Sequence, residues 1–111
     1  MKKILILPGD GIGQEVTNEC LKIISYFQKD HEIEYTEDLF GGASIDAHGK
    51  PLTNKVLEKA MDADAVLLGA VGGPKWEQLD HNLKPEKGLL TLRKELEAFA
   101  NLRPGKVFPA L

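Results

Sequence analysis

A glycine-rich run near the start of the chain combines residue types that can hold a charged or polar ligand. In Pro8-Gly-Asp-Gly-Ile-Gly-Gln-Glu15 the glycines let the backbone pass close to a ligand, and the helix expected next offers free N–H groups. The spacing does not match the dinucleotide fingerprint, because the positions for its third glycine hold Gln14 and Val16. Considered alone, this run is interpreted more simply as a tight turn that serves only the fold.

A second glycine-rich run, Val71-Gly-Gly-Pro-Lys-Trp76, follows an apolar stretch with the signature of a buried strand. In open α/β sheets, ligands bind beyond the carboxyl ends of the strands, which favours a binding role. A wide turn with Trp76 packed on the core explains the run equally well. The loop expected over residues 72–88 exceeds the usual limit of about 12–15 residues, which favours function.

Arg93 and Arg103 are the only arginines in the chain. The planar guanidinium suits two-point binding of a carboxylate, so both are candidate ligands of an acidic substrate. The alternatives are a solvated helix residue for Arg93 and a surface ion pair for Arg103, since charged side chains are usually exposed.

The remaining reactive side chains predict no metal or disulfide chemistry. His31, His48 and His81 lack metal-ligand spacing and are interpreted as surface residues. Cys20, the only cysteine, lies on the apolar stripe of a predicted helix and is expected in the core.

Composition narrows the class of protein. The 111 residues include 14 basic and 17 acidic side chains, a net charge of −3, with no basic surplus for nucleic acid. The apolar run near the N-terminus ends at Pro8 and is too short for a membrane helix or a signal peptide. We therefore expect a cytoplasmic protein with neither a nucleic-acid nor a membrane partner.

Hydrophobic periodicity predicts alternating strands and helices, the pattern of an α/β protein. Strands are expected at residues 4–7, at 32–36 and at 65–68. Helices are expected at 14–29, after an N-cap at Thr53, and over a stripe formed by Leu89, Leu92, Leu96 and Phe99. Gly41-Gly42 predicts a turn or a close backbone approach, and Val107-Phe108 predicts a further strand. The sequence stops within an apolar stretch at Leu111, so we expect it to continue in a longer protein.

Taken together, these segments resemble the 3-isopropylmalate dehydrogenases, a branch of the β-decarboxylating dehydrogenases. The motifs are PGDGIG, FGGASID, LLGAVGGPKW, PEKGLLTLRKELEAFANLRP and KVFPAL. The resemblance implies an isopropylmalate dehydrogenase-like α/β sheet with flanking helices, which is not a Rossmann fold and is incomplete in this chain. Residues 1–111 would form the N-terminal part of the first, discontinuous domain. The second domain and the C-terminal completion would lie elsewhere.

The same resemblance implies roles for individual residues. Arg93 and Arg103 would bind the malate carboxylates, Leu89 and Leu90 would face the isopropyl group, and Glu86 would lie between the substrate and the nicotinamide ribose. The residues implied in NAD binding are Ile12, Gly73, Pro74, Lys75, Trp76, Glu77, Gln78, Leu79, Asp80, His81, Asn82, Leu83, Lys84, Pro85 and Glu86. Gln14 replaces the proline common in the family, and we expect little consequence, because glutamine also suits a first helical turn.

The implied activity is NAD-dependent oxidative decarboxylation of 3-isopropylmalate to 4-methyl-2-oxopentanoate, in leucine biosynthesis. Mg²⁺ or Mn²⁺ would assist, held by ligands outside this chain, and the full-length protein would be a homodimer. No catalytic residue and no metal ligand is expected within residues 1–111, so the chain alone should be inactive.

Two alternatives remain open from the sequence. One is an isocitrate- or tartrate-type member of the same family, although Leu89-Leu90 favours an apolar substrate, because a second carboxylate there would lack a partner. The other is a small, non-catalytic α/β binding module.

Overall fold

A three-stranded parallel sheet forms the centre of the computed structural model, which describes residues 1–111. Strand β1 (Lys2–Gly9) lies between β2 (Ile33–Glu37) and β3 (Ala65–Ala70). Leu5 is in register with Thr36 on one side and Val66 on the other. Because all three strands are parallel, their carboxyl ends meet at one edge of the sheet, where the glycine-rich runs begin.

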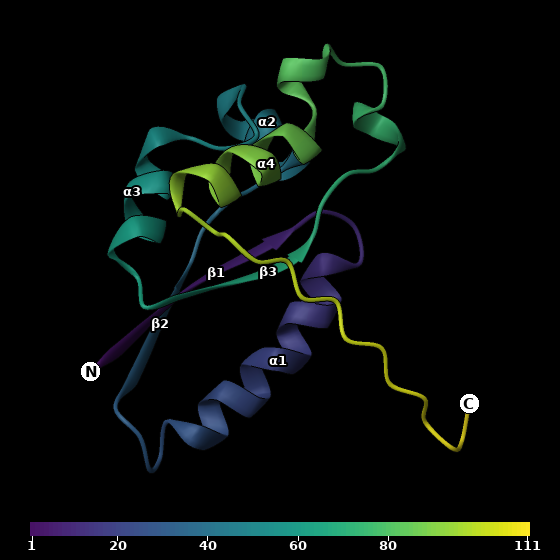
Figure 1. The fold of residues 1–111 in the computed structure, drawn as a ribbon. Coiled ribbons are helices and arrows are strands. Elements are labelled where there is room, and N and C mark those ends of the chain that lie inside the picture. Colours follow the sequence, from purple (N-terminus) through teal and green to yellow (C-terminus); the bar gives the residue numbers. More distant parts are fainter.

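Helices cover both faces of this sheet (Figure 1). Helix α1 (Gly13–Phe27) lies on one face, and α2 (Gly42–His48), α3 (Asn54–Asp62) and α4 (Pro85–Glu95) gather over the other. The Thr53 hydroxyl accepts a hydrogen bond from the backbone N–H of Val56, which confirms the predicted N-cap of α3. No helix combines the length and the apolar character that crossing a membrane requires.

The apolar core lies between the sheet and the helices of the second face. Its members are the buried apolar residues Leu5, Leu7, Phe40, Val56, Ala60 and Leu92. Leu5 and Leu7 come from β1, whose residues Leu5 to Pro8 are all buried. This confirms the buried first strand and the α/β class expected from the sequence.

The predicted 72–88 loop is wrong at its C-terminal end. Residues 72–84 contain two 3₁₀ turns, η1 (Pro74–Trp76) and η2 (His81–Leu83), and α4 begins at Pro85. Proline lacks an N–H and has a fixed φ, so it fits the first turn of a helix as readily as a loop. Gly88 therefore lies inside α4, where the helix packs closely on Pro51 and leaves little room for a side chain: a Cβ at Gly88 would lie 3.0 Å from the Cβ of Pro51.

Two expectations for the C-terminal region are also wrong. Helix α4 ends at Glu95, Glu97 turns the chain away with φ of 55°, and Phe99 is 100% exposed instead of continuing the apolar stripe. Val107 and Phe108 join no strand, because no neighbouring backbone pairs with them. The segment that follows α4 runs away from α2, α3 and α4 to the C-terminus (Figure 1).

Two further expectations need correction. Gly41-Gly42 is a close approach, as expected, but it also begins α2, whose seven residues are too few to show a helical period.

Cys20 is only half-buried. It lines an open apolar hollow between α1 and β3 and does not belong to the core, because no other element covers that side of α1.

Candidate functional site

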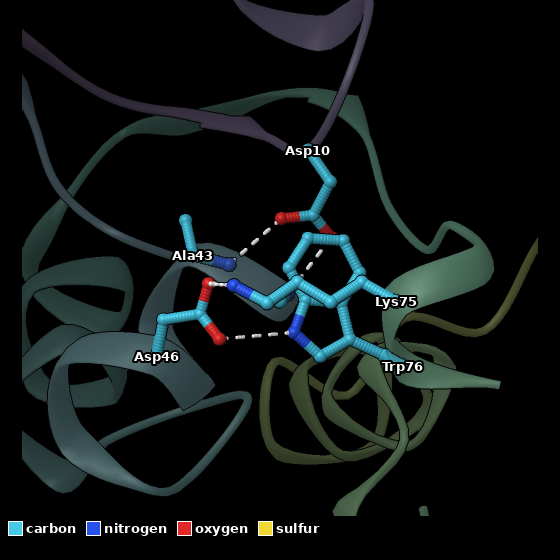
Figure 2. A network of polar contacts seen from close by, with 6 residues as sticks. Asp10, Ala43, Asp46, Lys75 and Trp76 are labelled. Atoms are coloured by element: carbon cyan, nitrogen blue, oxygen red, sulfur yellow. Dashed lines mark hydrogen bonds and ion pairs between the residues drawn. The ribbon is translucent and has the colours of Figure 1, made fainter. Parts of the chain in front are cut away.

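The loops after β1, β2 and β3 meet at the carboxyl edge of the sheet. Each contains one of the glycine-rich motifs, and polar contacts join all three (Figure 2). Asp10 follows β1, Gly42 and Asp46 follow β2, and Trp76 follows β3. This edge is where open α/β sheets bind their ligands.

The Asp10 carboxylate organises this edge. The side chain is only 5% exposed and accepts three backbone hydrogen bonds. Oδ2 accepts the N–H of Gly42 at 2.8 Å and of Gly72 at 2.9 Å, and Oδ1 accepts the N–H of Ala43 at 2.8 Å. The carboxylate therefore caps the first turn of α2 and fixes the start of the loop after β3.

The turn at the end of β1 aims Asp10 at these groups. Gly9 adopts φ of 76°, and a Cβ there would lie 1.8 Å from the carbonyl oxygen of Ala70, so only glycine fits. The Asp10 N–H then donates to that carbonyl at 2.7 Å. Close contact between β1 and β3 thus requires the glycine and orients the aspartate.

Asp46, on α2, holds the beginning of the 73–86 segment. Its Oδ1 accepts a hydrogen bond from Trp76 Nε1 at 3.2 Å, and its Oδ2 pairs with Lys75 Nζ at 2.7 Å (Figure 2). The hydrogen bond from Lys75, and then that from Trp76, lower the pKa of the Asp46 carboxyl. Lys75 Nζ also lies 5.7 Å from the centre of the Trp76 ring, a cation–π contact.

The Trp76 ring lies directly against Gly42. A Cβ at Gly42 would meet three ring atoms at 2.2–2.4 Å, so the absence of a side chain creates the space that the indole fills. Trp76 is therefore half-buried against α2 and not within the core cluster, so the alternative that packs Trp76 on the core is wrong.

A hollow of about 230 Å³ lies between the two ends of the 73–86 segment. Its lining combines backbone, charge and an indole: Gly72, Gly73, Trp76, Glu77, Lys84, Pro85 and Glu86. The Glu86 carboxylate lies over Gly72, where a Cβ would approach its oxygen to 2.6 Å. Gly72, with φ of 94°, thus allows Glu86 to lie against the backbone.

The middle of the 73–86 segment does not line this hollow. Asn82 and Leu83 line a separate hollow of about 260 Å³, next to Lys50 and Lys87. Ile12, at the start of α1, is 59% exposed and lines neither hollow. The structure therefore brings together the two ends of the expected NAD-binding segment, and places its middle and Ile12 apart from them.

The two arginines are exposed and have no protein partner. Arg93 lies on α4 and Arg103 in the segment after it, and neither side chain forms a hydrogen bond or an ion pair. The surface ion pair considered for Arg103 is therefore absent. Leu89 packs against the core cluster, whereas Leu90 is 54% exposed.

Comparison with known proteins identifies the family. Residues 3–111 match the isocitrate/isopropylmalate dehydrogenase family. The chain belongs to this family. A 3-isopropylmalate dehydrogenase from Hydrogenovibrio crunogenus is 57% identical over 112 residues, which covers 99% of this chain and 31% of that protein. One from Ruegeria pomeroyi is 56% identical, covering 97% and 30%.

A solved dehydrogenase structure shares the fold. The apo crystal structure of a beta-decarboxylating dehydrogenase from Thermococcus kodakarensis superimposes with a TM-score of 0.70 and 29% identity. The match covers 87% of this chain and 27% of that one. The chain thus spans about a third of the length of the curated isopropylmalate dehydrogenases that it matches.

The dehydrogenase family implies NAD and a divalent metal, and the residues present fit only the first. The backbone of Gly72 and Gly73, which lines the hollow, an indole and the charges of Lys84 and Glu86 can contact the polar groups of a dinucleotide. No three His, Cys, Asp or Glu side chains gather into a group that could hold a metal ion.

Sequence reasoning assigned no role to Asp10 or Asp46, although both lie in the family motifs. The available signal was their position: Asp10 sits in a glycine turn after the buried strand β1, and Asp46 follows strand β2 by a short interval. Their partners are 32 and 30 residues away in the chain, at Gly42 and Trp76, so no local pattern indicated the contacts.

Proposed function

We propose that residues 1–111 form the N-terminal part of the first, discontinuous domain of an NAD-dependent 3-isopropylmalate dehydrogenase. The whole enzyme would convert 3-isopropylmalate to 4-methyl-2-oxopentanoate. The supporting observation is the hollow at the carboxyl edge of the sheet, where Glu86 and the loop after β3 meet. These residues lie within the region over which the chain is 56–57% identical to dehydrogenases of that name.

NAD would contact the 73–86 segment and Ile12, and would supply the hydride acceptor when bound. Gly72 and Gly73 would let the backbone approach it closely, and Trp76 would offer an apolar face. Glu86, at the mouth of the hollow, would accept hydrogen bonds from hydroxyl groups of the nicotinamide ribose and from the substrate.

The substrate would lie beside α4. Arg93 and Arg103 would hold its carboxylates, because both guanidinium groups are free of protein partners. Leu90 exposes apolar surface that suits an isopropyl group, and Leu89 would support it from the edge of the core. The Mg²⁺ or Mn²⁺ ligands would lie outside these residues, and the whole protein would be a homodimer.

The test is an activity assay on the whole protein that carries this segment. NADH formation is measured with 3-isopropylmalate, isocitrate and tartrate in turn, each with Mg²⁺, and we expect the highest kcat/KM with 3-isopropylmalate. The 111-residue chain alone should not exceed the blank. Preference for isocitrate or tartrate would contradict the substrate, and turnover by the chain alone would contradict its dependence on further residues.

A further inference from the structure

Asp10 and Asp46 bind the chain at two points, one just before the 73–86 segment and one in its first turn. Asp10 holds the N–H of Gly72 from a buried position, and Asp46 holds Trp76 and Lys75 from the surface of α2. Between these points the chain has little local support, because the turn η1 is only three residues long. The position of this turn therefore depends on the aspartates.

Asp10 and Asp46 differ in what they contribute to the free energy of unfolding. Asp10 is buried, so removing it leaves buried N–H groups without an acceptor. The Asp46–Lys75 pair is exposed, with 44% of the Asp46 side chain and 67% of the Lys75 side chain accessible to solvent. Exposed pairs add little to the free energy of unfolding, so Asp46 acts on local position more than on the fold.

The Trp76 indole connects Asp46 to the hollow. One edge of the ring donates to Asp46, its face lies against Gly42, and the same side chain lines the hollow with Glu86. A tryptophan whose ring is fixed in this way presents its surface in one orientation, which lowers the entropic cost of binding a ligand there.

We propose that Asp46 is a positioning residue, which orders the first turn of the 73–86 segment through Trp76 and Lys75 and so prepares it to bind NAD. This inference rests on the proposed function. Asp46 itself does not line the hollow and would not touch the dinucleotide.

The experiment compares Asp46→Ala with the wild-type whole enzyme. Loss of a positioning residue should raise the NAD dissociation constant and the KM for NAD roughly three- to tenfold. The kcat at saturating NAD, the KM for 3-isopropylmalate and the Tm should stay nearly unchanged. Amide hydrogen exchange should become faster in residues 73–84, measured without any ligand.

Two further variants separate positioning from a general effect. Asp62→Ala removes another exposed aspartate, paired with Lys3 at 3.1 Å at the other end of the sheet, and should leave NAD binding unchanged. Trp76→Phe removes the indole N–H. If Asp46 acts through Trp76, adding Asp46→Ala to Trp76→Phe should weaken NAD binding less than it does in the wild type.

Three results would overturn the inference alone: an unchanged NAD dissociation constant in Asp46→Ala, full additivity with Trp76→Phe, or a fall in every parameter together with Tm. By contrast, a wild-type protein that neither binds NAD nor oxidises 3-isopropylmalate would overturn the proposed function, and this inference with it. The two failures are therefore distinguishable.

Discussion

The Asp10 carboxylate accepts the backbone N–H of Gly72 at 2.9 Å, although the two residues lie 62 positions apart in the chain. The contact joins the turn after β1 to the turn after β3. Since the same oxygen also accepts the N–H of Gly42, a single side chain sets the relative positions of three loops. The geometry of the candidate site thus depends on a residue that lies beneath it.

Replacing Asp10 should destabilise the protein. Asp10→Ala removes the acceptor of three backbone N–H groups, one buried and two part-buried, and an unsatisfied buried group costs about 1–3 kcal/mol. We expect a loss of roughly 3 kcal/mol or more in the free energy of unfolding of the whole protein. Asp10→Asn, which keeps one oxygen acceptor, should lose less. Urea unfolding measures both, and equal stability of Asp10→Ala and Asp62→Ala would contradict the assignment.

Gly42→Ala should displace Trp76. At the first position of a helix, alanine would ordinarily stabilise the protein by about 0.4–1 kcal/mol. Here the new methyl group would overlap the indole, so we expect a red shift of Trp76 fluorescence and weaker NAD binding. Gly105→Ala, where a Cβ meets nothing within 4 Å, is the matched control. Unchanged fluorescence in Gly42→Ala would show that the ring does not occupy this space.

Acid should release Trp76 from Asp46. The pKa of Asp46 lies below the ordinary value of 3.8, because Lys75 and Trp76 both hydrogen-bond the charged form. Because the folded-state pKa is lowered, the contact contributes its full stability at pH values above the ordinary pKa. That stability is lost as the pH falls through the folded-state pKa. Trp76 is the only tryptophan, so its emission in the dilute 111-residue chain should change with a midpoint below 3.8. A midpoint above that value, or the same transition in Asp46→Asn, would exclude this contact as the cause.

Arg93 and Arg103 should act on substrate and not on the fold. Loss of one partner in a shielded carboxylate contact costs about 2–5 kcal/mol, which corresponds to roughly 30-fold or more in kcat/KM. Arg93→Ala and Arg103→Ala in the whole enzyme should show this loss with an unchanged Tm, because neither side chain has a protein partner. Arg93→Lys and Arg103→Lys should restore little of the lost kcat/KM, because lysine lacks the planar guanidinium group. Efficiency within a few-fold of wild type would exclude the carboxylate role.

The isolated 111-residue chain should be prone to aggregation. Val16, Ile23 and Phe27 on α1 are 51%, 62% and 47% exposed, and both outer strands of the sheet have an unpaired edge. Size-exclusion chromatography and thermal unfolding test this expectation. A monodisperse monomer with a sharp cooperative transition would contradict it and would favour an independent binding module.

Hydrophobic periodicity predicted the strands and helices that bury one whole apolar face. The strand at Leu5 and the helix around Val56 were identifiable because their core contacts impose a repeat on the sequence. Helix α2 was missed because its first turn is capped by Asp10, from another part of the chain. The last helix was extended too far, to Phe99, because an apolar residue at the right spacing says nothing about the turn at Glu97.

The sequence was enough to predict which segments form the candidate site, but not which residues within them contact one another. The motifs around Gly72 and Glu86 were recognised, and the structure places these two residues together. The roles of Asp10 and Asp46 depend on contacts between loops after different strands, which spacing within one segment cannot reveal. Nor did the sequence indicate that Asn82 and Leu83 face a separate hollow.

The position of Asp10 also dictates an order of events during synthesis. Asp10 leaves the ribosome well before Gly72, and until β3 has formed beside β1, one of its hydrogen-bond donors does not exist at the right place. Closing so long a stretch of chain is entropically costly and is favourable only once the strands pair. The carboxylate must therefore stay hydrated through early folding. The hollow that Gly72 lines can form only once the Gly72 N–H has replaced that water.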